Sequence, residues 1–144
     1  MIRITDQPFD PWREIAVFQA AHPGLAGHYG ATAVFVGTMR NLNEGAAIEA
    51  MTLEHYPAMT MRELERIRAE ALQRWPVLEA LVIHRVGELK PDDPIVLVAV
   101  WSAHRDAAFA ACRYLIDDLK TRAPFWKKER TPGGERWVEP GGKN

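Results

Sequence analysis

The sequence predicts an α+β fold with mostly antiparallel strands and two long helices, and three observations support this class. Two stretches repeat apolar residues at every third or fourth position, which is the spacing of an amphipathic helix. Several shorter stretches are rich in β-branched and aromatic residues, as strands are. Turn sequences with proline, glycine and aspartate separate pairs of these stretches, which favours antiparallel hairpins.

The first third of the chain predicts a strand, a helix and a second strand that ends in a polar loop. Met1–Ile4 is the short first strand. A helix is predicted over Asp10–Ala21, because its opening Asp-Pro pair suits the N-cap and the first helical position. Tyr29–Thr38 is apolar and β-branched, which predicts a buried strand. The polar segment Met39–Gly45 then predicts a loop, because Asn, Gly and charged residues favour turns.

The middle third predicts a strand, a long helix and a hairpin. Ala47–His55 is the strand, and Pro57–Trp75 is the helix, which the next proline terminates. The apolar face of this helix consists of Met61, Leu64, Ile67, Ala71 and Trp75. Two further strands, Ala80–Val86 and Ile95–Trp101, flank the turn sequence Lys90–Pro94, so we expect them to pair as a hairpin.

The last third predicts a second long helix and a C-terminal hairpin. Ser102 is a candidate N-cap for a helix over His104–Arg122, whose Ala, Cys and Leu residues share one face. An Ala-Pro pair ends this helix. Phe125–Arg130 and Glu135–Val138 then flank the turn sequence Thr131–Gly134, which fits a closing hairpin.

Length and composition indicate a chain that folds as one unit. We expect a single domain over residues 1–138 and a flexible tail over residues 139–144, whose Pro-Gly-Gly composition resists packing. Apolar residues make up 47% of the chain and charged residues 26%, as in ordinary globular proteins. The formal net charge of -1 gives no overall electrostatic reason to expect nucleic acid or a membrane as partner.

The cysteine content and the start of the chain favour the cytoplasm. The single Cys112 cannot form an internal disulfide, which fits a reducing compartment. The first residues resemble neither a signal peptide nor an Arg-rich transit sequence, and no apolar run is long enough to span a bilayer.

Two short segments place cations beside predicted strand ends. Arg40 follows the strand that ends at Thr38, where its planar guanidinium suits a phosphate or carboxylate; the alternative is an exposed arginine in an ordinary turn. His104 and Arg105 stand at the predicted start of a helix, whose N-terminal amides attract anions. The alternative there is a plain helix cap, formed by Ser102 and Asp106, with both cations in solvent.

The most unusual segment is Lys120–Arg130, which contains five basic residues and one acidic residue in a nearly neutral chain. Strand alternation places Lys127 and Lys128 on opposite faces, so only one of them faces a given site. A lysine that is partly desolvated beside other cations loses its proton more easily, which makes Lys127 a candidate base or nucleophile, with Lys120 close to it. The alternative is a basic helix end followed by a charged edge strand.

Other side chains suggest no further chemistry. The histidines have no recognisable metal-ligand spacing, and His84 lies in an apolar strand, where a hydrogen-bonded structural role is favoured. Cys112 lies on an apolar helix face and is expected to be a small buried hydrophobe. The glycines match no phosphate-binding loop. We therefore expect neither a metal nor a cofactor.

Six segments in order resemble the large, catalytic subunit of molybdopterin synthase, the MoaE family, over Gly30 to Val138. They are FVGTMRNLNEG, LEHYPAMT, HRVGEL, SAHRDAAF, LKTRAPFWKKE and ERWV. The resemblance implies an α/β-hammerhead fold and a homodimer of large subunits within a heterotetramer. It also implies a small ubiquitin-like partner whose C-terminal Gly-Gly thiocarboxylate donates sulfur to cyclic pyranopterin monophosphate, giving the dithiolene of molybdopterin in molybdenum cofactor biosynthesis.

The resemblance also implies roles for individual residues. Lys120 and Lys127 match the catalytic lysines. The residues that match substrate-binding, partner-binding or adjacent pocket positions are Thr38, Met39, Arg40, His104, Arg105, Lys128 and Glu129. Since the thiocarboxylate, the cyclic phosphate and the oxyanion formed during transfer are all negative, a pocket of such cations would stabilise the developing charge.

Two other classes of function remain open at this point. In the first, the basic groove only holds the acidic tail of a partner and performs no chemistry. In the second, Trp126 and Trp137 stack on single-stranded nucleic acid beside the basic strand, although the near-zero net charge argues against this.

Overall fold

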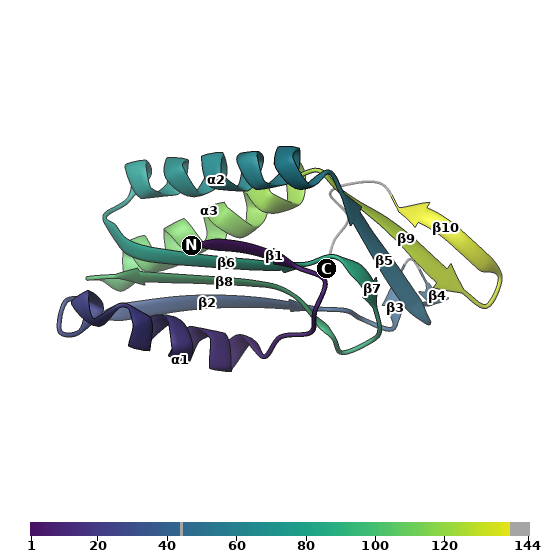
Figure 1. The fold of residues 1–144 in the computed structure, drawn as a ribbon, viewed down its shortest axis with the longest axis horizontal. Coiled ribbons are helices and arrows are strands. Elements are labelled where there is room, and N and C mark those ends of the chain that lie inside the picture. The colour runs from purple at the N-terminus through teal and green to yellow at the C-terminus, as the bar shows by residue number, and fades with distance from the viewer. Residues whose placement is uncertain (44, 139–144) are drawn as a thin grey trace.

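The computed structural model describes residues 1–43 and 45–138, which form two four-stranded β-sheets and a short two-stranded one. Figure 1 shows the helices packed on one of the four-stranded sheets. The helices are α1 (Pro11–Ala21), α2 (Pro57–Arg74) and α3 (Arg105–Arg122), with a 3-10 turn at Pro23–Leu25. The strands are β1 (Ile2–Thr5), β2 (Ala31–Thr38), β3 (Leu42–Asn43), β4 (Ala46–Ala47), β5 (Ala50–His55), β6 (Val77–Arg85), β7 (Gly87–Leu89), β8 (Pro94–Ser102), β9 (Phe125–Thr131) and β10 (Gly134–Val138). This arrangement confirms the predicted α+β class.

The first sheet has the strand order β1-β6-β8-β2. β8 lies at its centre and pairs antiparallel with β6 on one side and with β2 on the other. β1 is parallel to β6, with Ile2 aligned to Val82, so the mostly antiparallel prediction holds with one exception. In Figure 1, α2 and α3 cover one face of this sheet and α1 covers the other.

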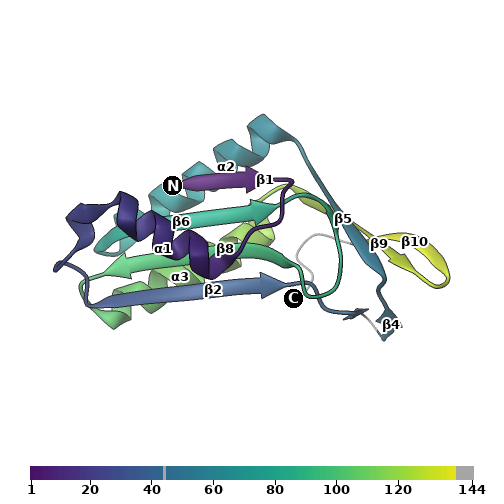
Figure 2. The same ribbon diagram turned by 60° about the horizontal axis from the view of Figure 1, so that its bottom comes forward.

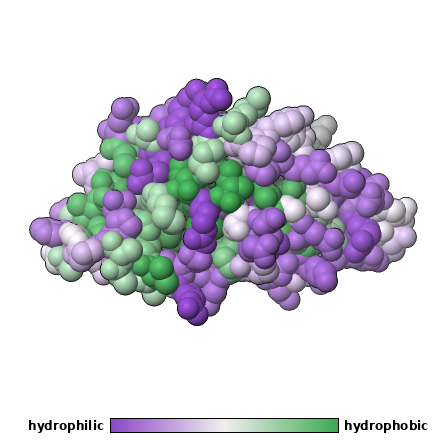
Figure 3. Space-filling model, viewed as in Figure 1, coloured by the Kyte–Doolittle hydropathy of each residue, from purple (hydrophilic) through white to green (hydrophobic). Residues whose placement is uncertain are grey.

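The second sheet has the order β10-β9-β5-β7 and extends from one end of the first, as Figure 2 shows. β9 is one of its two inner strands, pairing antiparallel with β5 and with β10, and Lys127 lies opposite Leu53. The short strands β3 and β4 pair with each other beside it. The right-hand end of the molecule in Figure 3, where this sheet lies, has a mostly hydrophilic surface.

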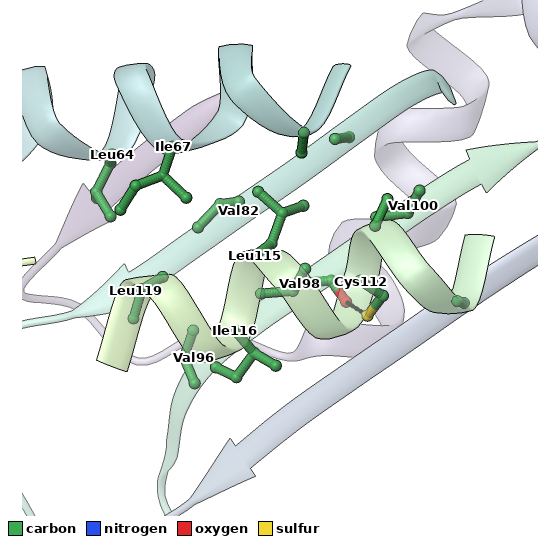
Figure 4. Packing of buried hydrophobic residues seen from close by; sticks show 14 of the residues in the cluster. Leu64, Ile67, Val82, Val96, Val98, Val100, Cys112, Leu115, Ile116 and Leu119 are labelled. Carbon is green, nitrogen blue, oxygen red and sulfur yellow. Dashed lines mark hydrogen bonds between the residues drawn. The ribbon is translucent and has the colours of Figure 1, made fainter. Parts of the chain in front are cut away.

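The main core lies between the first sheet and the helices α2 and α3 (Figure 4). Leu64 and Ile67 of α2, and Leu115 and Leu119 of α3, are all at least 97% buried there. Each such side chain contributes about 2 kcal/mol when it leaves water. A second cluster packs α1 against the opposite face of the sheet, where the rings of Phe18 and Trp101 stack at 4.9 Å. The buried contacts fix α3, whose end carries Lys120.

Several local expectations are corrected by the structure. Ser102 does not cap α3: it is the last residue of β8, and its hydroxyl donates to the carbonyl of Pro76 at 2.9 Å. His104 occupies the N-cap position, without a capping side-chain hydrogen bond. In contrast, the Asp10 carboxylate does accept from the amides of Trp12 and Arg13, as the Asp-Pro pair predicted.

The strand boundaries also differ from the expected ones. The expected loop Met39–Gly45 contains β3, and the expected strand Ala47–His55 is divided into the end of β4 and β5. β6 and β8 pair as predicted, but the connection between them contains β7, which joins the other sheet. Gly87 has φ +82°, a conformation that favours glycine, at the point where the chain leaves β6.

The expected flexible tail over residues 139–144 lies outside the described residues. In the part of the chain that the structure describes, no helix is both long enough and apolar enough to cross a membrane.

Candidate active site

Lys120 and Lys127 are brought to the corner where α3 turns into β9. Lys120 lies in the last turn of α3, and Lys127 is the third residue of β9. The helix ends at Ala123-Pro124, and the buried hydroxyl of Thr60 on α2 donates to the Pro124 carbonyl at 3.2 Å. This hydrogen bond ties the corner to the main core, so the two lysines are held by packed elements.

Both lysines are partly buried, and their pKa values are lowered. Desolvation, followed by the positive charge of Lys127, lowers the pKa of Lys120 to about 7. Desolvation also lowers the pKa of Lys127, an effect that the Glu129 carboxylate opposes. At neutral pH the Lys120 amine is therefore partly unprotonated and can act as a base or a nucleophile beside a second ammonium group.

His84 is a buried residue close to this lysine pair. Its imidazole is 4% exposed and stacks on Phe125, with ring centroids 3.9 Å apart. Its Nδ1 lies 2.7 Å from the carbonyl of Arg85. Burial, and then the nearby Lys120 and Lys127, lower the pKa of His84 to about 3, so the ring is neutral. The hydrogen-bonded structural role is confirmed, but its closeness to the lysines was not predicted, because sequence spacing does not show it.

A small cavity of about 40 Å³ lies next to Lys127. Five of the predicted site residues line it, from two separate regions of the chain: Thr38, Met39, Arg40, Lys127 and Glu129. Met39 forms its buried apolar side, while the Arg40 side chain is exposed to solvent. The cavity thus combines cations with an apolar wall, which suits an anionic group attached to a less polar body.

Glu129 is the buried carboxylate of this cavity, with 6% of its side chain exposed. It accepts from the Asn43 amide at 2.9 Å and from the Arg136 guanidinium at 3.1 to 3.2 Å. Asn43 and Arg136 were not among the predicted site residues. The presence of Arg136 in the segment ERWV was the only sequence signal for it.

Lys128 lies on the opposite face of β9, as the alternation predicted. Its ammonium group is 3.4 Å from the Glu135 carboxylate and 5.4 Å from the centroid of Trp137. On that face Tyr56, Trp126 and Trp137 line a wider cavity of about 280 Å³. The structure thus does not bring Lys128 together with Lys127.

His104 and Arg105 are also distant from the lysine pair within one chain. Both are exposed at the start of α3, whereas Lys120 is near its end. Lys120 is fifteen positions after Arg105 in α3, which corresponds to about 22 Å along a helix at 1.5 Å per residue. A single chain therefore presents two separate groups of cations.

The described residues contain no group of three or more His, Cys, Asp or Glu side chains that could hold a metal ion. Cys112 is buried as expected, and desolvation raises the pKa of its thiol to about 11, so it is a poor nucleophile. The chemical groups available at the site are amines, a guanidinium, hydroxyl or amide dipoles and the paired Glu129 carboxylate. The cations and dipoles among them suit stabilisation of a negative charge that develops during a reaction.

Comparison with known proteins identifies relatives over most of the chain. Residues 4–122 match the family model described as MoaE protein. A molybdopterin synthase catalytic subunit from Ralstonia nicotianae is 52% identical over 138 residues, which are 96% of this chain and 76% of the relative. The structure of molybdopterin synthase from Staphylococcus aureus superposes with a TM-score of 0.84 at 32% identity, covering 94% of this chain and 95% of that chain.

A more distant solved structure has the same fold. It is a protein-protein complex of subunits 1 and 2 of molybdopterin-converting factor from Helicobacter pylori 26695, with a TM-score of 0.78 and 21% identity. The match covers 96% of this chain and 90% of that chain.

Proposed function

The chain belongs to the MoaE protein family, and we propose that it is the catalytic subunit of a molybdopterin synthase, a sulfurtransferase of molybdenum cofactor biosynthesis. It transfers sulfur from the thiocarboxylated C-terminus of a small ubiquitin-like subunit to cyclic pyranopterin monophosphate, and two transfers give the dithiolene of molybdopterin. The observation that carries this function is the partly buried pair Lys120 and Lys127 beside the cavity that Arg40 lines. No cofactor is needed for this reaction.

The two lysines are proposed to act on different molecules. Each transfer forms a bond between the thiocarboxylate sulfur and a pterin carbon, which loses a bond to oxygen. The carrier's acyl carbon loses its bond to that sulfur and ends on an oxygen from water, so the carrier leaves as a carboxylate. Lys127 lines the cavity, and we assign to it proton transfer or charge stabilisation at the pterin. We assign Lys120, whose pKa is about 7, to the carrier's terminal carbonyl, where its neutral amine can take the acyl group from sulfur as an amide that water then hydrolyses, freeing both the carrier and the lysine.

The remaining predicted site residues are assigned to binding. Arg40 and Thr38 offer a guanidinium and a hydroxyl to the anionic substrate at the cavity, while Met39 gives it an apolar wall. Lys128 is proposed to contact the partner from the reverse face of β9, because it shares that face with Trp137. Glu129 is proposed to support the cavity from within.

A homodimer could bring the two groups of cations together at one site. We propose that His104 and Arg105 of one copy complete the site of the other, since α3 keeps them about 22 Å from the lysine of their own chain. α3 contacts β2, an edge strand of the first sheet, and α3 exposes Phe109 to solvent. With one small subunit on each large one, the assembly is a heterotetramer. The α/β-hammerhead type, with its C-terminal hairpin, and a cytoplasmic location belong to the same proposal.

The test is conversion of cyclic pyranopterin monophosphate to molybdopterin by this chain mixed with a thiocarboxylated small subunit. We expect product from the wild type, and a rate at least about 100-fold lower from Lys127→Ala and Lys120→Ala. Lys90→Ala, which removes an exposed lysine from a turn, serves as the control. Binding of the small subunit without any turnover would instead favour a noncatalytic binding module. Normal product from both variants would contradict the assigned lysine roles.

A further inference from the structure

The buried Glu129 carboxylate stands where an anionic substrate is expected to bind. A free carboxylate in the cavity would repel that substrate, and burying its charge without partners would be strongly unfavourable. Its two oxygens are instead engaged by other residues: Oε1 accepts from Arg136, and Oε2 accepts from Asn43. The negative charge of Glu129 is therefore paired with groups of the protein and is not left free to face a ligand.

Arg136 joins three segments of the chain at this point. It lies opposite Glu129 in the antiparallel pair of β9 and β10. Its Nε donates to Glu129 Oε1 at 3.2 Å, and its Nη2 lies 3.1 Å from the same oxygen in an ion pair. Nη2 donates to the Asn43 backbone carbonyl at 3.0 Å. The Asn43 side chain returns a hydrogen bond to Glu129. β3, β9 and β10 are thus linked through one guanidinium.

The segment that this cluster holds is the one that carries Arg40. At its start, Met39 exchanges backbone hydrogen bonds of 2.9 Å with Asp92 and Asp93 in the turn before β8. At its end, Asn43 is held by Glu129 and Arg136. Arg40 lies between these two anchors, at the edge of the cavity that Lys127 also lines.

We propose that Arg136 and Asn43 are positioning residues, which engage Glu129 and so hold the segment Met39–Asn43 with Arg40 directed at the cavity beside Lys127. Neither residue touches the reacting atoms. Both act through Glu129 and the backbone, so their loss should weaken substrate binding more than it slows the chemical step. The kinetic part of this inference rests on the proposed function, whereas the structural part does not.

The first experiment replaces Arg136 by Gln, which retains a polar side chain but removes the charge and the forked donors. In the assay with thiocarboxylated small subunit, KM for the pterin is expected to rise about tenfold, equivalent to about 1.4 kcal/mol, while kcat changes by less than about twofold. Arg3→Gln is the matched control, because it removes the Arg3 to Glu14 ion pair on the far side of the first sheet. It should leave both constants unchanged.

A second readout does not depend on activity. Hydrogen exchange of the peptide that contains Met39–Asn43 should be at least about tenfold faster in Arg136→Gln than in wild type or in Arg3→Gln, because one anchor of the segment is lost. Exchange in α3 should stay unchanged, which separates local release from general unfolding. If the wild type makes no product, the proposed function fails, yet this measurement still tests the anchor.

Two further substitutions separate charge from geometry. Asn43→Asp has the same shape but sets a second carboxylate against Glu129, so it should raise KM and accelerate exchange at least as much as Arg136→Gln. Arg136→Lys keeps the charge but loses the fork, and should restore KM only in part. Unchanged exchange in Met39–Asn43 for both Arg136→Gln and Asn43→Asp would overturn the proposal. So would a fall in kcat with an unchanged KM.

Discussion

The imidazole of His84 lies flat against the phenyl ring of Phe125, with 3.9 Å between the centroids and 11° between the planes. This contact joins β6 of the first sheet to β9 of the second, directly behind the lysine pair. Because the ring is buried and neutral, its protonation opposes folding.

Stability should therefore fall as the pH is lowered past the ordinary pKa of histidine. The pKa of His84 is about 3 in the folded chain and 6.5 in the unfolded one, so the unfolded chain binds more protons between these values and stability rises with pH there. His84→Phe keeps a stacked ring and cannot titrate. Urea unfolding between pH 4 and 7 should show a shallower pH dependence for this variant, and an unchanged one for His28→Gln, which removes an exposed histidine. Equal slopes for wild type and His84→Phe would contradict this reading.

Lys120 should titrate near neutral pH, and the positive charge of Lys127 should help to set its pKa. The positive charge of Lys127 contributes to the lowered pKa of Lys120, so Lys127→Gln should raise the Lys120 pKa above about 7 while desolvation still keeps it below 10.5. NMR titration of isotopically labelled lysine side chains measures this directly, without any substrate. A Lys120 pKa that does not change in Lys127→Gln would show that the two amines are not coupled.

Phe109 should be a contact of the homodimer. Its side chain is 67% exposed on α3, on the side of the molecule where that helix meets the edge strand β2. An aromatic side chain this exposed is typical of an interface, and a carboxylate in its place should prevent association. Sedimentation of Phe109→Glu should give a monomer where the wild type gives a dimer. Trp12→Glu on α1, at a residue that is 64% exposed, should remain dimeric. A dimeric Phe109→Glu would place the interface elsewhere.

Mixed dimers should recover activity that neither parent has. If each site takes Lys127 from one copy and Arg105 from the other, a dimer of Lys127→Ala with Arg105→Ala contains one site with both defects and one intact site. Random exchange should then restore about a quarter of the wild-type rate, because half of the dimers are mixed. The measurement is turnover before and after the two inactive variants are mixed and allowed to exchange. No recovery after verified exchange would show that each site is built from a single chain.

The fold class and most elements could be predicted because they depend on local patterns. The Asp-Pro start of α1, the apolar face of α2 and the Ala-Pro end of α3 are determined by neighbouring residues in the chain. The parallel pairing of β1 and the sheet change at β7 depend on contacts between distant segments, which no local pattern contains.

In the candidate site, too, the features that depend on local patterns could be predicted, and those that depend on contacts between distant segments could not. Alternation along β9 correctly separated Lys127 from Lys128, because the direction of a strand side chain depends only on its position. The stacking of His84 behind the lysines depends on how the two sheets meet, and the bonds of Asn43 to Glu129 span 86 residues. Neither contact had a sequence signal of its own.

The passage of the chain between the two sheets affects how the protein is made. β2, β6 and β8 belong to one sheet, β5, β7 and β9 to the other, and they alternate along the chain. During synthesis on the ribosome, β2 and β6 can pair with β8 only after β8 has emerged. In the same way, β5 can pair with β9 only after β9 has emerged. The strand that carries Lys127 thus arrives among the last, and a nascent chain that stops short of it has all four strands of the first sheet but lacks Lys127 of the proposed catalytic pair.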